Sequence, residues 1–267
     1  MKRMIGVSTK AEGLNRANFA AYRENGIGVI EVSVSDVDYD AQDLPKIVAD
    51  ARAEGILPWS FHLRFWPFEQ YTIEIFDEDA RKKAVDYAAL WIRRAATAGF
   101  RYAVIHPSGE PIADANRETA MQNAEASLRV LAAAAREAGI TLAVENLPRT
   151  CLAKNSAELL RLLSVDPDLR VCFDTNHLLC EPTLDFMEAV KDKVVTLHLS
   201  DYDFVNERHW LPGGGQIDWR ALMHKLDAIG YTGVLMYETH QARMSDGSTR
   251  PLTPADFRQN AAWLESL

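Results

Sequence analysis

The sequence predicts a single-domain (β/α)8 barrel, because eight short hydrophobic runs alternate with helical segments at nearly even spacing. The runs are rich in valine and isoleucine and almost continuous, as expected for parallel strands buried on both faces. They occupy Met4–Ser8, Gly28–Val32, Ile56–His62, Tyr102–His106, Ile140–Glu145, Arg170–Asp174, Val194–His198 and Gly233–Glu238. The average unit is about 33 residues, close to the length of a βαβ repeat. We expect one barrel over residues 1–267.

The segments between the runs show helical patterning. Asp79–Gly99 has apolar residues at helical spacing and closes on a glycine, which suits the left-handed cap of a helix. Ala115–Gly139 repeats this pattern. Further helices are expected over Asn155–Leu163, from Pro182, from Asp218 and over Thr253–Leu267. The last of these would close the barrel.

An open, doubly wound sheet would use the same alternation of strands and helices. However, no Gly-x-Gly-x-x-Gly fingerprint follows the first run. Gly213-Gly214-Gly215, after the seventh run, lacks the lysine of a phosphate-binding loop. Together with the eight even units, these observations favour the closed barrel.

Composition excludes several classes of protein. The formal net charge of −9 works against a polyanionic partner, so no nucleic acid is expected as a ligand. The three cysteines show no C-x-x-C spacing and are expected to be free thiols. No apolar stretch approaches the roughly 18 residues of a membrane span, and the first ten residues have no signal-peptide core. We therefore expect a cytoplasmic protein without a membrane partner.

One connection is unusually aromatic. The segment Arg64–Asp77, after the third run, contains five aromatic side chains. Such a loop either packs locally, forms a contact between subunits of a homo-oligomer, or lines an active site. The sequence leaves these alternatives open.

Carboxylates and histidines gather where the predicted strands end. In a (β/α)8 barrel the chemistry lies at these carboxyl ends. The residues there are Glu31, His62, His106, Glu145, Asp174, His198 and Glu238, and His177, Asp201, Glu207 and His209 lie just beyond. A single histidine is more often an ordinary buried residue, but five beside strand-ending carboxylates are hard to explain in that way.

This pattern predicts a metal site. Buried aspartate and glutamate are costly unless they are paired or bound to a cation. Because barrel strands converge, their end residues would face one shared position. Mixed oxygen and nitrogen ligands suit Mn, Co, Zn or Mg rather than a metal that prefers thiolates.

Four segments resemble a known family, the xylose isomerase-like barrels known as sugar-phosphate isomerases/epimerases. They are Val144-Glu145-Asn146, Phe173-Asp174-Thr175-Asn176-His177, Leu197-His198-Leu199-Ser200-Asp201 and Trp210–Trp219. The resemblance implies one divalent metal ion held by Glu145, Asp174, His198 and Glu238. It also implies a carbohydrate substrate, with Glu145 and Glu238 as an acid/base pair.

The residues themselves agree with this chemistry. Removing a proton beside a carbonyl needs a base and a cation that stabilises the resulting enediolate. Two carboxylates on opposite faces would allow removal on one side and return on the other. Residues expected to contact the substrate are His62, His106, His177, Arg208 and His209. Arg64, Arg149, Lys154 and Arg208 are candidates for a phosphate contact, so free and phosphorylated sugars both stay open.

A rival resemblance leads to a different function. The ketose 3-epimerase branch has an arginine three residues before the Pro-Gly, where this chain has His209. Apurinic-site endonucleases of the same superfamily bind three zinc ions, so more than one zinc is an alternative. The full set of zinc ligands in this chain would be His62, His106, Glu145, Asp174, His177, His198, Glu207, His209 and Glu238. The acidic charge and the lack of DNA-probing insertions favour the isomerase or epimerase. A keto-polyol dehydratase would use the same metal and glutamates.

Overall fold

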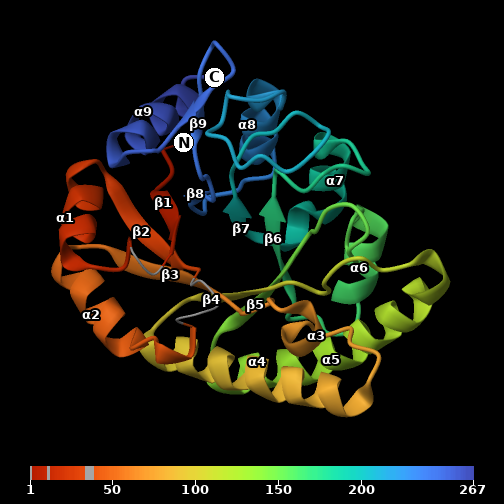
Figure 1. Ribbon diagram of the computed structural model, residues 1–267. Coiled ribbons are helices and arrows are strands. Elements are labelled where there is room, and N and C mark those ends of the chain that lie inside the picture. Colours follow the sequence, from red (N-terminus) through yellow and green to blue (C-terminus); the bar gives the residue numbers. More distant parts are fainter. Residues whose placement is uncertain (1, 11–12, 34–38) are drawn as a thin grey trace.

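Eight parallel strands form the centre of the protein, and helices surround them (Figure 1). The computed structural model describes residues 2–10, 13–33 and 39–267. The barrel strands are β1 (Ile5–Thr9), β2 (Ile27–Val32), β3 (Leu57–His62), β4 (Tyr102–Ile105), β5 (Thr141–Glu145), β6 (Arg170–Asp174), β7 (Val194–His198) and β8 (Leu235–Tyr237). Each of the eight lies within about a residue or two of a predicted run. The predicted (β/α)8 barrel is therefore confirmed.

The strands follow one another around the barrel in the order β7-β6-β5-β4-β3-β2-β1-β8. The ladder between β7 and β8 is reduced to a bridge that joins Leu199, just after β7, to Tyr237 of β8. The Leu199 amide donates to the Met236 carbonyl at 2.8 Å, and the Glu238 amide donates to the Leu199 carbonyl at 3.1 Å. These bonds bring the ends of β7 and β8 together, which positions His198 beside Glu238.

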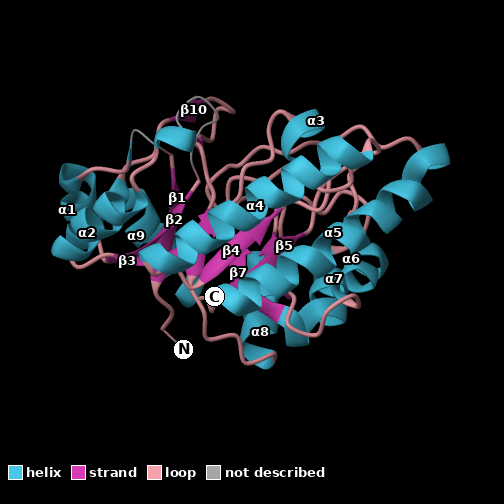
Figure 2. Cartoon of the chain, turned by 90° about the horizontal axis from the view of Figure 1, so that it is seen from below, coloured by secondary structure: helices cyan, strands magenta, loops and turns pink. Residues whose placement is uncertain are grey.

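Helices cover the outside of the barrel (Figure 2). They are α1 (Arg16–Glu24), α2 (Leu44–Ala53), α3 (Phe68–Tyr71), α4 (Glu78–Ala98), α5 (Arg117–Ala138), α6 (Ser156–Leu163), α7 (Thr183–Val190), α8 (Trp219–Ala228) and α9 (Pro254–Glu265). Three 3-10 turns (Tyr39–Ala41, Asp114–Asn116, Lys191–Lys193) and a short hairpin of β9 (Ala242–Arg243) and β10 (Thr249–Arg250) complete the described elements. No helix within the described ranges is long and apolar enough to cross a membrane.

The helix ends follow from local chemistry. The Asp77 side chain accepts a hydrogen bond from the Ala80 amide and begins α4. The same helix ends at Gly99, whose φ of +93° lies in the left-handed region that glycine adopts without strain. Gly139 ends α5 in the same way, with φ of +74°. Both glycine caps were predicted from the sequence.

Side chains fill the barrel interior in layers below the strand ends. Val29, Trp59, Tyr102, Val234 and Met236 form one buried cluster. Gly6 is required beside it, because a Cβ there would lie 2.7 Å from methyl groups of Val29 and Val234. Val104, Ala143 and Cys172 form a second small cluster. Because alternate residues of a strand face the same side, Glu145 and Asp174 lie one layer above Ala143 and Cys172, at the carboxyl ends of their strands.

Candidate functional site

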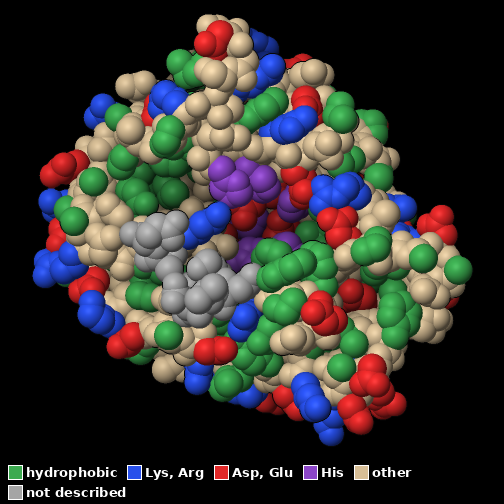
Figure 3. All heavy atoms as spheres, viewed as in Figure 1, with side chains coloured by type: hydrophobic (Ala, Val, Ile, Leu, Met, Phe, Trp, Pro, Cys, Tyr) green, Lys and Arg blue, Asp and Glu red, His purple; other side chains and the backbone are tan. Residues whose placement is uncertain are grey.

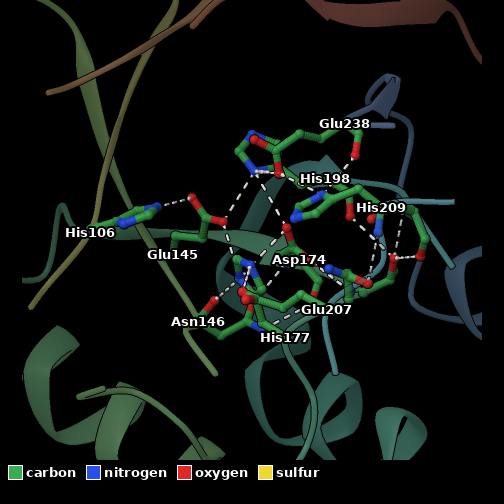
Figure 4. Close-up of polar contacts among 12 residues, drawn as sticks. His106, Glu145, Asn146, Asp174, His177, His198, Glu207, His209 and Glu238 are labelled. Carbon is green, nitrogen blue, oxygen red and sulfur yellow. Dashed lines mark hydrogen bonds and ion pairs between the residues drawn. The ribbon is translucent and has the colours of Figure 1, made fainter. Parts of the chain in front are cut away.

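The four predicted metal ligands come together at the carboxyl ends of the strands (Figure 4). Glu145 ends β5, Asp174 ends β6, His198 ends β7 and Glu238 follows β8. One ligand atom of each lies within 4.8 Å of the ligand atoms of the other three. His198 Nδ1 lies 3.2 Å from Glu145 Oε1, 3.3 Å from Glu238 Oε2 and 3.8 Å from Asp174 Oδ2. One imidazole nitrogen thus faces three carboxylates.

This arrangement fits a divalent cation. Asp174 Oδ2 is buried and has no hydrogen-bond partner among the described residues. Burial raises the pKa of Asp174 well above its usual value, because a desolvated carboxylate is costly without a cation. Three carboxylates and one imidazole make a ligand set of hard oxygen and borderline nitrogen atoms. Such a set suits Mn, Co, Zn or Mg.

Glu31, the residue before the last one of β2, holds the predicted ligand His198 in place. Its Oε1 lies 2.9 Å from His198 Nε2, and its carboxylate also accepts hydrogen bonds from the Ser8 and Ser60 hydroxyls at 2.9 and 2.6 Å. A carboxylate partner at Nε2 favours the tautomer whose Nδ1 lone pair faces the other carboxylates. Glu31 stands at a predicted strand end, but no pattern in the sequence indicates this role.

Amide and hydroxyl side chains fix the neighbouring strand ends. Asn146 donates to the Asp174 carbonyl and accepts from the Asp174 amide, both at 2.8 Å. The Thr175 hydroxyl donates to the Ser200 carbonyl at 2.6 Å. Asn176 accepts from the Arg208 amide at 3.1 Å, which ties the loop after β7 to the end of β6. These contacts give a structural role to three motif residues beside the ligands.

His62 and His106 both face Glu145. The Nε2 atom of each lies 3.3 Å from Glu145 Oε2. His62 Nδ1 lies 2.9 Å from the Leu63 carbonyl, to which it donates. Burial lowers the pKa of His106. Burial also opposes protonation of His62, but the Glu145 carboxylate outweighs it and raises that pKa.

A third group lies on the other side of the cluster. His177 Nε2 lies 3.0 Å from Glu207 Oε1, and His177 Nδ1 lies 2.9 Å from the Asn146 carbonyl. His209 lies close enough to join His177 and Glu207 in a candidate metal group. Although burial disfavours the charged imidazole, Asp174 and Glu207 raise the pKa of His177 to about 10. His177 is therefore cationic when no metal is bound.

These side chains line a pocket of about 300 Å³ at the mouth of the barrel. Figure 3 shows the hollow, with histidine and carboxylate side chains at its floor. The aromatic segment after β3 forms part of the wall, since Phe65 and Phe68 line the pocket and the Phe65 ring stacks on His106 at 4.1 Å. Trp66 and Phe76 of the same segment are about half exposed. Among the alternatives, the segment thus contributes a wall of this pocket.

The structure brings together His62, His106, His177 and His209, but it does not bring Arg208 to the pocket. The Arg208 guanidinium donates to Asp203 at 2.7 Å and lies 5.7 Å from the Trp210 ring centroid. Since this ion pair directs the side chain away from the pocket lining, the geometry gives no support to the predicted substrate contact. In contrast, His240 had no predicted role, yet it lines the pocket and stacks on His209 at 4.5 Å.

A (β/α)8 barrel with a cluster of candidate metal ligands at the carboxyl ends of its strands has the architecture of a barrel enzyme, because active sites of this fold lie at that end. Residues 19–267 match the family model described as xylose isomerase-like TIM barrel. The chain belongs to that family, which confirms the resemblance seen in the motifs.

Named relatives are sugar-modifying enzymes. A fructoselysine 3-epimerase of Shigella flexneri is 26% identical over 203 residues, which cover 70% of this chain and 73% of that protein. A D-tagatose 3-epimerase-like protein has the same fold, with a TM-score of 0.81 at 20% identity over 100% of this chain and 96% of its own. The 3-keto-D-glucoside 4-epimerase of E. coli superimposes with a TM-score of 0.76 at 22% identity over the full length of both chains. The epimerase relative from Shigella flexneri confirms the prediction that the protein is an enzyme, and the two solved structures confirm the fold.

Proposed function

We propose that this protein is a divalent-cation-dependent isomerase or epimerase that acts on a carbohydrate by moving a proton beside a carbonyl group. The observation that supports it most directly is the cluster of Glu145, Asp174, His198 and Glu238, in which two glutamates reach one position from β5 and β8. The name of the fructoselysine 3-epimerase relative supports the same reaction class.

Glu145 and Glu238 would move the proton. Burial opposes ionisation of Glu238, but His198 outweighs it and lowers the pKa of Glu238 to about 2. His198 and His106 likewise overcome burial and lower the pKa of Glu145. In the metal-free protein both groups are therefore ionised at neutral pH, and a bound cation would favour the same charged form, which can accept a proton from carbon. A divalent ion held by the cluster would polarise the carbonyl and stabilise negative charge on the substrate oxygens.

The stereochemical outcome depends on how the two glutamates share the work. In an epimerisation one glutamate would accept the proton from one face, while the other would take up a proton from solvent and return it to the opposite face. The first glutamate would then release its proton to solvent. In an isomerisation one proton moves between adjacent carbons. His62, His106, His177 and His209 line the pocket around this position and can hydrogen-bond substrate hydroxyls.

The test is conversion of sugars by the metal-loaded enzyme. A panel of ketoses, keto-glycosides and sugar–amino acid conjugates is incubated with protein reconstituted with Mn, Co, Zn or Mg, and products are separated by chromatography. Formation of an epimer or an isomer that is lost with Glu238→Gln supports the proposal. A metal-loaded enzyme that converts no member of the panel contradicts it.

A second candidate function has a specific observation in its favour. Besides the four-ligand cluster, His62, His106 and Glu145 form one three-residue group and His177, Glu207 and His209 form another. Three adjacent cations would suit hydrolysis of a phosphodiester, as at an abasic site in DNA. The apolar wall and the net charge of −9 work against a polyanion. Metal-dependent cleavage of abasic DNA, with several zinc ions per chain, would favour this alternative.

A further inference from the structure

Arg149 lies on the pocket wall, and two carboxylates already occupy its guanidinium group. It follows β5, with a backbone φ of +48° that few residues other than glycine adopt. Arg149 Nε donates to Glu110 Oε2 at 3.0 Å, and Nη2 donates to the other oxygen of the same carboxylate. Arg149 Nη1 donates to Glu207 Oε2. The three nitrogens of the guanidinium are therefore all engaged.

The geometry with Glu110 is the one that a phosphate would need. Arginine recognises carboxylates and phosphates through a fork of two parallel N–H groups. Here the fork of Nε and Nη2 is taken by Glu110, so a phosphate would have to displace a carboxylate from it. The bridge continues into the site, because the remaining oxygen of Glu207 lies 3.0 Å from His177 Nε2. Glu110, Arg149, Glu207 and His177 thus form a continuous row of polar contacts along the wall.

The rest of the lining offers little to an anion. Glu110 and Glu207 outnumber the one guanidinium between them, and a divalent cation would neutralise only two of the three carboxylates Glu145, Asp174 and Glu238. Among the described residues of the lining, the remaining lysine or arginine is Lys10, which is solvent-exposed. Much of the remaining lining is apolar and consists of Phe65, Phe68, Leu147, Pro148 and Cys151. A phosphate dianion would lose hydration there without a free guanidinium to receive it.

We propose that the Glu110–Arg149–Glu207 bridge makes the pocket selective against anionic substrates, so that the enzyme acts on carbohydrates without a phosphate group. This inference rests on the proposed function and narrows its substrate class. In it, Glu110 is a specificity-determining residue: it saturates the arginine that would otherwise form a phosphate subsite. Arg149 acts as a wall element that also holds Glu207 against His177.

Matched pairs of substrates test the inference. D-fructose is compared with fructose 6-phosphate, and D-ribulose with ribulose 5-phosphate, as kcat/KM of the metal-loaded wild-type enzyme. We expect the free sugar of each pair to be preferred by about tenfold or more, because an unneutralised charge in a desolvated pocket is strongly disfavoured. In Glu110→Gln, which frees the fork and removes one negative charge, this ratio should move toward the phosphorylated sugar by about tenfold.

Glu118 provides a matched control. It also receives two hydrogen bonds from one arginine, Arg161, both at 2.8 Å, but on the exposed outer face of the barrel. Glu118→Gln removes the same kind of fork and should leave the substrate ratio unchanged. Titration calorimetry with inorganic phosphate gives a second measurement, in which Glu110→Gln should bind phosphate more tightly than wild type or Glu118→Gln.

The outcomes separate this inference from the proposed function. If the wild-type enzyme prefers the phosphorylated sugars, the inference is overturned while the proposed isomerase or epimerase function stands. The same holds if the ratio of kcat/KM for free and phosphorylated sugar is equal in wild type and in a folded Glu110→Gln variant. If the Glu110→Gln variant fails to fold, the preference of the wild-type enzyme for free or phosphorylated sugar decides the inference by itself. If no sugar of any pair reacts, the wider panel of sugars described above decides the proposed function. Phosphate titration then decides the inference, and equal affinities for wild type and Glu110→Gln overturn it.

Discussion

Replacing Glu31 with glutamine should weaken metal binding while leaving every direct ligand in place. Glu31 is fully buried, and its Oε2 accepts a hydrogen bond from His198 Nε2 at 3.1 Å, with Oε1 at 2.9 Å from the same nitrogen. Glutamine keeps the shape and an accepting oxygen, but it removes the charge that favours the Nδ1 lone pair of His198. A charge-assisted hydrogen bond then becomes a neutral one, which is weaker by about 1 kcal/mol.

The size of the effect can be expressed as a shift in melting temperature. Loss of a carboxylate that orients a histidine ligand lowers metal affinity by about 10- to 100-fold, or about 1.4–2.7 kcal/mol. At a saturating metal concentration the same free energy is lost from the stabilisation that the metal provides. For 267 residues the unfolding entropy is about 0.56 kcal/mol/K, so the metal-induced rise in Tm should shrink by about 2–5 °C.

Calorimetry of chelated and metal-loaded protein measures this difference. Glu74→Gln is the matched control, because Glu74 is also a buried glutamate but accepts from the Gly109 amide outside the metal cluster. The metal-induced shift should be reduced in Glu31→Gln and unchanged in Glu74→Gln. An equal shift in wild type and Glu31→Gln would refute the role given to this residue.

Three further predictions concern the same cluster. Asp174→Asn should stay folded, as measured by circular dichroism, because a neutral amide replaces a buried carboxylate. It should lose the metal-induced rise in Tm, and a full rise would contradict the assignment of Asp174 as a ligand. His62→Ala, His106→Ala and His177→Ala should each lower kcat/KM by about tenfold or more, and a collapse of Tm in all three would instead make them structural residues. In chelated protein the raised pKa of His177 stabilises the fold fully below its ordinary pKa, and this stability is lost as pH rises toward about 10. Glu207, whose pKa is lowered to about 2 by His177 and Arg149 against the effect of burial, loses its contribution as pH falls toward 2. His177→Gln should therefore flatten the alkaline limb of a Tm–pH profile, and an unchanged limb would refute the pairing.

The barrel and its ligand cluster could be predicted from the sequence because both depend on strand periodicity. A hydrophobic run fixes which alternate residues face the interior, and closure of the barrel makes the last interior residues converge. Glu145, Asp174 and His198 end their strands as predicted. Glu31 is the residue before the last one of β2. Its distance from His198 depends on the register of the strands around the barrel, which the sequence does not reveal.

The parts that could not be predicted lie in the loops. Arg149 and His209 have φ of +48° and +47° without being glycine, so nothing in the sequence marks these turns. Their backbone conformations direct Arg149 toward Glu110, and the loop after β7 places Arg208 on Asp203 instead of in the pocket. Side-chain direction in such loops is set by ion pairs between distant segments. The ion pair between Glu110 and Arg149, which lie 39 positions apart in the sequence, illustrates this.

The most direct test of the proposed chemistry is exchange of a carbon-bound hydrogen with solvent. Wild-type enzyme loaded with metal is incubated in heavy water with a sugar that it converts, and NMR follows the hydrogen on the carbon next to the carbonyl. If Glu145 and Glu238 transfer protons at that carbon, deuterium should appear there with wild type and be abolished by Glu145→Gln and by Glu238→Gln, while the matched Glu118→Gln exchanges normally. Conversion without any deuterium at that carbon, or undiminished exchange in both glutamine variants, would contradict the account.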